Sequence, residues 1–249
     1  MKTLLSSKQV PKKTPKVSFV IRTKNEGRFI GKVLKFLYRQ TFKDFEVIII
    51  DSGSTDKTLV AARKFPTKII KIKSEEFNFS YALNLGISKA KGDFIGVISG
   101  HSIPVSDSWL ADGLNNFDNK KVVGVSGYYT EVPIGYFSRF LGRIFFAPYQ
   151  KKKHIDSAWM TNTNALIRKK AWGLYPFDEK LPDCEDYDWA SEMLARGYKI
   201  VKDPKFSVFH SHFLLRRPGW LARQPQWKKT CALIDKRKRP RKPYTKIKM

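Results

Sequence analysis

The first hundred residues alternate between short apolar runs and longer segments in which apolar residues recur at helical spacing. Short runs rich in β-branched residues are typical of buried strands. They predict strands at Val17–Ile21, Val47–Ile50, Ile69–Ile72 and Phe94–Ile98. Apolar positions three and four residues apart predict helices over 27–40, 55–64 and 80–90, the second of them capped by Ser54 or Thr55. Strands alternating with helices indicate an α/β fold with a mostly parallel, doubly wound sheet.

The second half of the chain is less regular. We expect extended segments over 122–132, 162–168 and 206–212, and a helix over 185–196. No internal repeat and no linker rich in Gly and Ser divides the sequence. A single domain over 16–213 is therefore expected, with a basic N-terminal arm (1–15) and a basic C-terminal tail (214–249).

Charge changes this picture at the two ends of the sequence. The chain of 249 residues has 48 Lys and Arg against 22 Asp and Glu, a net charge of +26. Residues 1–16 hold five basic and no acidic residues, and residues 214–249 hold thirteen basic and one acidic. Such flanks indicate an anionic partner, either a membrane surface or nucleic acid.

Other features bear on the compartment. No apolar run approaches the roughly 18 residues of a spanning helix. The Leu4–Leu5 pair is too short for a signal-peptide core. Cys184 and Cys231 fit neither a metal pattern nor a disulfide framework. We therefore expect a cytoplasmic protein, whose basic tail allows peripheral attachment to the cytoplasmic face of a membrane.

Three polar segments follow predicted strands, where ligands bind in doubly wound sheets. Arg22–Gly27 opens a helix, whose N-terminus attracts anions. Asp51–Asp56 places a carboxylate where it can accept hydrogen bonds from a ribose or a base. In Ser99–Pro104, His101 is a competent ligand for a divalent cation. Each segment alone is more typical of an ordinary turn. The glycine-rich dinucleotide and P-loop fingerprints are both absent.

Two further segments have chemistry of their own. Four acids lie within Asp183–Asp188, in a chain that is otherwise short of acid. The helix dipole stabilises acids in a first turn, yet their mutual repulsion favours a bound cation or a proton-transfer role. Residues 159–164 alternate amides and hydroxyls before an extended run. That pattern suits sugar hydroxyls, or the polar face of a half-exposed strand.

A short amphipathic segment lies between Pro133 and Pro148. Its apolar residues stand at helical spacing, and Arg139 and Arg143 occupy the other face. The apolar residues are Phe137, Phe140, Leu141, Ile144 and Phe145. The pattern fits an interfacial helix on anionic lipid, and it equally fits a surface helix packed on the sheet.

Taken in this order, the segments resemble a family 2 glycosyltransferase of the GT-A fold, with rhamnosyltransferase-like members the most similar. The resemblance covers about residues 16–213. It is carried by IIIDSGSTDKT, by NFSYALNLGISKAKGDFIGVIS, by TNTNALIRKKAW, by PFDEKLPDCEDYDWASEMLARGYKIV and by VFHSH. The resemblance implies a single Rossmann-like domain with a central, mostly parallel sheet.

The resemblance also implies a function. A sugar would pass with inversion from a nucleoside-diphosphate-sugar donor to a hydroxyl of a glycan or lipid-linked acceptor, in cell-surface polysaccharide or glycolipid synthesis. Asp186 would be the general base, and Glu185 would orient it or the acceptor. The implied nucleotide-binding residues are Arg22, Thr23, Asn25, Glu26, Asp51, Ser99 and Gly100. The implied acceptor-binding residues are Asn162, Asn164 and Trp189.

One motif departs from the family. Ser99-Gly100-His101 stands where the family has Asp-x-Asp. His101, with His210 or His212, would then hold the divalent metal, and Mn²⁺ tolerates imidazole better than Mg²⁺ does. Alternatively, Arg22 or Lys24 neutralises the diphosphate, or the chain is an inactive relative that binds nucleotide or glycan. A basic nucleic-acid-binding protein is the remaining hypothesis, and it leaves the acidic segment without a role.

Overall fold

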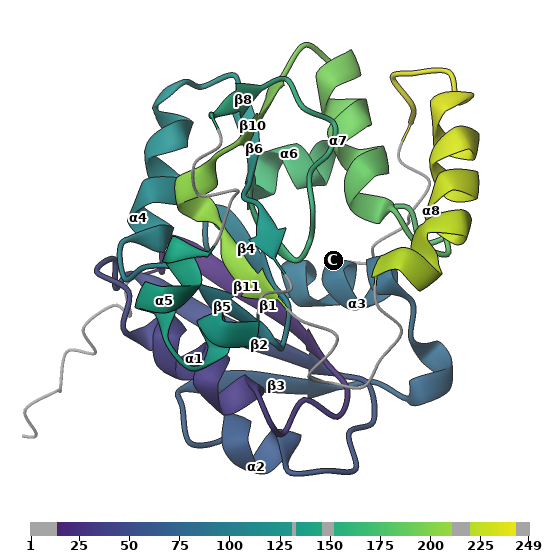
Figure 1. Ribbon diagram of the computed structural model, residues 1–249. Coiled ribbons are helices and arrows are strands. Elements are labelled where there is room, and N and C mark those ends of the chain that lie inside the picture. The colour runs from purple at the N-terminus through teal and green to yellow at the C-terminus, as the bar shows by residue number, and fades with distance from the viewer. Residues whose placement is uncertain (1–13, 131–132, 146–151, 211–219, 243–249) are drawn as a thin grey trace, which may run out of the picture.

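A computed structural model describes residues 14–130, 133–145, 152–210 and 220–242 (Figure 1). The strands are β1 Val17–Thr23, β2 Phe45–Asp51, β3 Thr67–Lys71, β4 Phe94–Ile98, β5 Ser102–Pro104, β6 Val122–Ser126, β7 Tyr129–Thr130, β8 His154–Ile155, β9 Asn164–Arg168, β10 Lys199–Lys202 and β11 Val208–His210. The α-helices are α1 Ile30–Tyr38, α2 Thr58–Ala62, α3 Phe79–Ser88, α4 Trp109–Leu114, α5 Arg139–Ile144, α6 Lys169–Leu174, α7 Glu185–Ala195 and α8 Trp220–Asp235. Short 3-10 turns are η1 Ser74–Glu76, η2 Asn115–Asp118, η3 Pro133–Tyr136 and η5 Pro204–Phe206.

The main sheet has eight strands in the order β3-β2-β1-β4-β9-β6-β10-β8. Strands β3, β2, β1 and β4 pair in parallel, as β6 and β10 do. Strand β9 runs antiparallel to both β4 and β6, and β8 runs antiparallel to β10. A smaller sheet, β5-β11-β7, lies beside it. The sheet is therefore mostly parallel, and β9 joins its two parallel parts.

Alternate residues of the central strands point to opposite faces of the sheet, so each face has its own core. Phe19 lies in the core that α1, α4 and β11 cover. Its neighbour Val20 lies in the core that α3, α6 and α7 cover. Helices on both faces explain why the central strands are almost wholly apolar. They also leave the ends of the strands for polar residues.

The predicted elements of the first half are present, with shifted ends. The third helix begins at Phe79 because the Asn78 side chain caps it, accepting from the N–H groups of Ser80 and Tyr81 at 2.8 and 3.1 Å. The second helix begins only at Thr58, and neither Ser54 nor Thr55 caps it. Both residues instead bind neighbouring loops at the candidate site.

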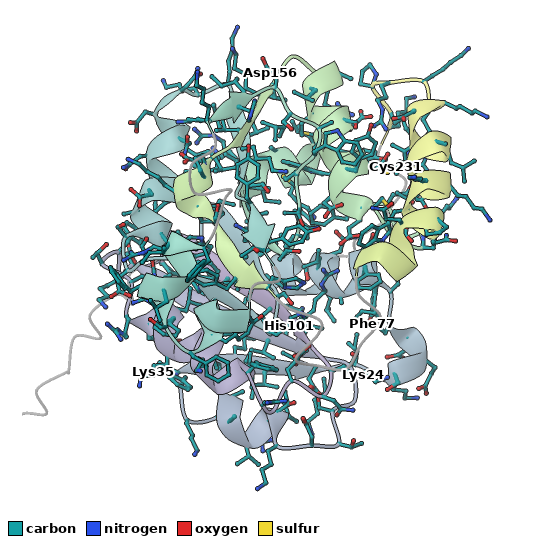
Figure 2. All side chains as sticks on the ribbon, viewed as in Figure 1. Lys24, Lys35, Phe77, His101, Asp156 and Cys231 are labelled. Carbon is teal, nitrogen blue, oxygen red and sulfur yellow. The ribbon has the colours of Figure 1, made fainter. Side chains whose placement is uncertain are left out.

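The basic tail contains a helix, α8, which was not predicted because the tail is so rich in charged residues. Helix α8 lies beside α7, and Cys231 in α8 has its Sγ 3.7 Å from the Sγ of Cys184 (Figures 1 and 2). Both cysteines are free thiols. Within the described residues, α8 and every other helix is too short or too polar to cross a membrane.

Candidate active site

Strands β1 and β2 end together, and their last residues meet. Thr23 and Asp51 are register partners at the carboxyl ends of the two strands. The Thr23 hydroxyl donates to Asp51 Oδ1 at 3.1 Å, and both side chains are buried. Two of the predicted nucleotide-binding residues are thereby brought into direct contact.

The loops that follow these two strands are tied to each other. The N–H and the hydroxyl of Ser54 donate to the Asp51 carboxylate at 3.0 and 2.5 Å. The N–H of Thr55 donates to Asn25 Oδ1 at 2.9 Å. Asn25 adopts a φ of 54° and Gly53 a φ of +84°, left-handed conformations that Asn and Gly tolerate best. These contacts define the shape of the two loops, and Ser54, expected from the sequence as a possible helix cap, belongs to them.

The Ser-Gly-His segment after β4 lies against the turn that follows β1. A Cβ on Gly100 would stand 2.9 Å from Glu26 Cγ and 3.2 Å from Thr23 Cγ2, so only glycine fits there. The Nδ1 atom of His101 lies 3.0 Å from Glu26 Oε1, and Ser99 Oγ lies 3.2 Å from the same nitrogen. His101 is in the interior of the molecule, 5% exposed (Figure 2).

Two of the predicted metal ligands, His101 and His210, lie side by side in the structure. Their rings are stacked, with centroids 4.3 Å apart and planes inclined by 27°. Each Nδ1 already has a partner, Glu26 for His101 and the Ser102 hydroxyl for His210. A histidine that ligates a metal through Nε2 commonly uses Nδ1 for a contact of this kind, so these partners are compatible with ligation.

Other side chains do not complete a metal site in the described part of the chain. No three His, Cys, Asp or Glu side chains there form a group that could hold an ion. His212 lies outside the described residues. The structure thus shows the Ser-Gly-His segment supporting the Glu26 turn.

The predicted acid pair lies at the start of α7 and is linked to β1. Arg22 Nη1 donates to Glu185 Oε1 at 3.1 Å, and Asn162 Nδ2 donates to the same oxygen at 3.2 Å. The backbone N–H of Asn162 donates to Asp186 Oδ2 at 2.8 Å, and that of Tyr187 donates to Asp186 Oδ1 at 2.8 Å. One network therefore joins the end of β1, the segment before β9 and the first turn of α7.

Asp186 has an unusual pKa for a carboxyl group. Burial, followed by the adjacent Glu185 charge, raises it to about 7. The two backbone N–H donors and the Arg22 charge act in the opposite direction, but they do not cancel the rise. A carboxylate with a pKa near neutral pH is well matched to accept a proton from a hydroxyl group.

Two of the predicted acceptor-binding residues are misplaced. Trp189 is fully buried in the core formed by α3, α6 and α7. Asn164 is fully buried as well, and its amide donates to the Phe206 carbonyl. Neither side chain can reach a soluble acceptor, because both are fully buried. The prediction failed because the residue type alone does not indicate which face of the element a side chain occupies. Asn162, the third, lies at the acid pair.

One further acid of the cluster, Asp188, has a different kind of partner, which the sequence did not indicate, and it shares these partners with Asp178 and Glu192 outside the cluster. The buried carboxylates of Asp178, Asp188 and Glu192 receive three arginines of the basic tail. Their ion pairs are Arg237 with Asp178 and Asp188 at 3.0 and 3.1 Å, Arg239 with Asp188 and Glu192 at 3.1 and 3.4 Å, and Arg241 with Asp178 at 3.3 Å. The positive charge expected beside the acid cluster is therefore supplied, at Asp188, by arginines of the same chain. The only signal in the sequence is the spacing of these arginines at every second residue.

Solved structures share this architecture. The mannosyltransferase PcManGT from Pyrobaculum calidifontis, in complex with GDP-Man and Mn²⁺, has a TM-score of 0.69 and 19% identity, over 96% of this chain and 70% of that one. S. aureus TarS in complex with UDP-GlcNAc has a TM-score of 0.64 and 17% identity, over 88% and 65%. These likenesses confirm the GT-A fold.

Relatives found by sequence are also named as glycosyltransferases. The O-antigen chain rhamnosyltransferase WbaN of Salmonella anatum is 28% identical over 80% of this chain and 67% of its own. A second relative is the dolichyl N-acetyl-alpha-D-glucosaminyl phosphate 3-beta-D-2,3-diacetamido-2,3-dideoxy-beta-D-glucuronosyltransferase of Methanococcus voltae, 25% identical over 76% of this chain and 64% of its own. The chain thus spans about two thirds of the length of these relatives. The model of glycosyl transferase family 2 matches residues 18–173, more than half of the chain. This chain belongs to glycosyl transferase family 2.

Proposed function

We propose that this chain is an inverting glycosyltransferase that moves a sugar from a nucleoside-diphosphate-sugar donor to a hydroxyl of a glycan or lipid-linked acceptor. The observation that carries the proposal is Asp186. Its carboxylate is held by two backbone N–H groups at 2.8 Å, and its pKa is raised to about 7. Family membership supplies the reaction class, and this carboxylate supplies the base that the class needs.

The chemistry assigned to Asp186 is a single proton transfer. The carboxylate takes the proton of the acceptor hydroxyl while that oxygen attacks the anomeric carbon, through an oxocarbenium-like state. Each oxygen of Asp186 accepts one backbone N–H, which fixes the carboxylate and leaves acceptor capacity for the substrate proton. Glu185, held by Arg22 and Asn162, keeps a second carboxylate beside the base.

We assign the donor to the carboxyl ends of β1 and β2, where Thr23 and Asp51 meet; we call this place the Thr23–Asp51 edge. The tied loops after β1 and β2 present backbone and small polar side chains there, as nucleotide sites in open α/β sheets do. The structural neighbours named above hold GDP-Man and UDP-GlcNAc, which supports a nucleotide-sugar donor for this chain. Arg22 and Lys24, at the end of β1 and just after it, supply positive charge for the diphosphate. No step is assigned to a metal ion, because no three His, Cys, Asp or Glu side chains of the described residues form a group that could hold one.

The acceptor class follows from the relatives. One is named for the O-antigen chain, and another is named for a dolichyl-linked sugar phosphate. A glycan or lipid-linked acceptor in surface polysaccharide or glycolipid synthesis is the corresponding proposal for this chain.

The test is Asp186→Asn, which keeps the shape of the side chain and one of its two acceptor oxygens but removes the base. Transfer is expected to fall by about a hundredfold or more, the typical contribution of general base catalysis. Calorimetry with nucleoside diphosphates and their sugars is expected to give an affinity within about twofold of the wild type, because Asp186 is held by Asn162 and Tyr187, which lie outside the loops after β1 and β2.

Three outcomes separate the hypotheses. Wild-type turnover in Asp186→Asn would show that another group is the base. Saturable donor binding by the wild-type chain, with no transfer to any acceptor, would favour the inactive relative. Nucleotide binding that is lost together with turnover in Asp186→Asn would instead indicate a structural role for this carboxylate.

A further inference from the structure

Five large apolar side chains are exposed in one short stretch of the chain. Single exposed apolar residues are ordinary in soluble proteins, whereas a contiguous group marks an interaction surface. Residues 140, 141 and 144 lie on one side of α5, because positions three and four apart on a helix are neighbours. The exposed fractions are 78% for Phe137, 64% for Phe140, 40% for Leu141, 57% for Ile144 and 63% for Phe145. We call these residues the apolar patch.

Helix α5 packs on the protein through glycine rather than through its apolar residues. Gly142 is the residue of α5 that is buried. A Cβ at this position would stand 2.6 Å from the Cα of Gly135 and 2.6 Å from the ring of Phe209 in β11. A surface helix of a globular protein normally turns its apolar stripe inward. Here the small residue faces inward and the bulky residues face outward, so the apolar patch does not serve the core.

Basic side chains surround the apolar patch. The Arg139 guanidinium lies 4.2 Å from the centre of the Phe36 ring, and Lys32 Nζ lies 5.7 Å from that of Phe137, which places α1 beside α5. Neither helix contains an Asp or a Glu. Exposed basic residues recur along one side of α1 and its flanks, at Arg28, Lys32, Lys35 and Arg39, and Figure 2 shows Lys35 on the outside of the molecule. We call these four residues the basic stripe.

We propose that the apolar patch and the basic stripe together dock on an anionic lipid bilayer. Phenyl and aliphatic side chains that enter the boundary between headgroups and acyl chains gain by leaving water. Lysine and arginine beside them are attracted to an anionic surface. A bilayer presents negative charge over an apolar interior at every point, which matches an apolar centre with a mainly basic rim. One acid lies in this rim, Asp107, which pairs with Arg39 at 3.2 Å and with Arg139 at 2.8 Å. This docking surface is distinct from the basic tail.

The docking surface lies next to the candidate active site. Tyr136, just before the apolar patch, donates its hydroxyl to the His101 carbonyl at 2.6 Å, and its ring packs on Phe29 at 5.2 Å. Docking through the apolar patch therefore holds the Ser-Gly-His segment close to the bilayer. That an acceptor anchored in the same bilayer is thereby presented to the site rests on the proposed function, whereas the docking itself does not.

The experiment measures co-sedimentation of the full chain with vesicles. Vesicles of phosphatidylcholine alone are compared with vesicles that contain about 30% phosphatidylglycerol. The wild type is expected to bind the anionic vesicles preferentially. Phe140→Ser with Ile144→Ser is expected to lower the partition coefficient about tenfold, and Lys35→Glu to reduce the preference for phosphatidylglycerol.

Two matched controls locate the surface. Val60→Ser with Leu233→Ser removes side chains that are exposed to a similar degree, 58% and 63%, outside the apolar patch, and partition is expected to stay within about twofold of the wild type. Lys236→Glu with Lys238→Glu tests the tail, whose two lysines are exposed. Loss of binding in the tail variant, with full binding in Phe140→Ser with Ile144→Ser, would overturn the proposal.

Self-association is the other competing result. Vesicle binding that is absent in the wild type, together with a dimer that Phe140→Ser with Ile144→Ser abolishes in light scattering, would assign the apolar patch to a second copy of the chain and overturn the proposal. Vesicle binding needs no transfer reaction, so it is measured equally well in Asp186→Asn. Failure of docking and failure of the proposed function are therefore separate results.

Discussion

Asp186 owes its raised pKa to two causes that can be separated by substitution. Burial is the larger and Glu185 the second, while Arg22 opposes both. Glu185→Gln removes the second cause but keeps an oxygen that can accept from Arg22 and Asn162. The electrostatic environment of the base is therefore adjustable without removing the base itself.

The rate of transfer is expected to depend on pH through the ionisation of Asp186. A general base must be ionised, so kcat/KM of the wild type is expected to rise as pH rises through about 7 and then to level off. In Glu185→Gln the carboxylate is easier to ionise, so the pKa of Asp186 falls and the rising limb moves to lower pH. Initial rates across pH check this. A limb that stays in place or moves to higher pH would contradict the assignment of Asp186.

The element that carries the base is α7, and it is held at two places. Its first turn binds Arg22 and Asn162, and its middle binds the arginines of the tail. The carboxylates of Asp188 and Glu192 are fully buried, so each needs a cation. The tail arginines therefore belong to the folded domain as much as α7 does.

Arg239→Ala is expected to lower the free energy of unfolding by about 3 kcal/mol, because it leaves buried carboxylates short of a partner. Lys238→Ala is the matched control, because the neighbouring Lys238 is exposed and its removal is expected to change stability by less than about 0.5 kcal/mol. Urea unfolding of both variants measures the difference. Equal midpoints would mean that the ion pairs do not stabilise the domain.

Some elements and contacts of this molecule could be predicted from its sequence, and others could not. The first four strands and three helices follow from local apolar periodicity, and the order of the motifs indicated the acid pair. Strands β5, β7 and β8 have two or three residues each, too few for any periodicity to be visible. The pairing of Arg239 with Asp188 joins residues far apart in the chain, and no spacing rule connects them. Trp189 was assigned to the acceptor from its type, whereas its position in the core is set by packing.

For the whole molecule, some of the 48 Lys and Arg side chains pair with acids inside, and such pairing leaves the net charge at +26. Arg22, Arg237, Arg239 and Arg241 face carboxylates of the same chain. The lysines of α8 and of the residues after it that are described, such as Lys228 and Lys238, remain exposed. Charge of this kind gives non-specific attraction to polyanions and carries no sequence information.

Salt is expected to weaken this non-specific attraction to polyanions. Affinity for a random DNA duplex is expected to fall by at least about tenfold between roughly 50 and 200 mM salt, whatever its sequence, because release of counterions drives the binding. Binding of the cognate nucleoside diphosphate at the Thr23–Asp51 edge is expected to change far less. Fluorescence anisotropy and calorimetry over the same salt range check this. Salt-resistant DNA binding with sequence preference would revive the nucleic-acid hypothesis.

The pairing of α7 with the tail arginines has a consequence for the order of events in the cell. Proteins are synthesised from the N-terminus, so Asp178, Asp188 and Glu192 are made well before Arg237, Arg239 and Arg241. Glu192 already has Arg196 at 2.8 Å, but Asp178 and Asp188 lack the cations that they bind in the folded domain until the tail arginines have been added. The sheet can assemble on the nascent chain, but α7, and with it the base, reaches its final stability only when the tail has been translated.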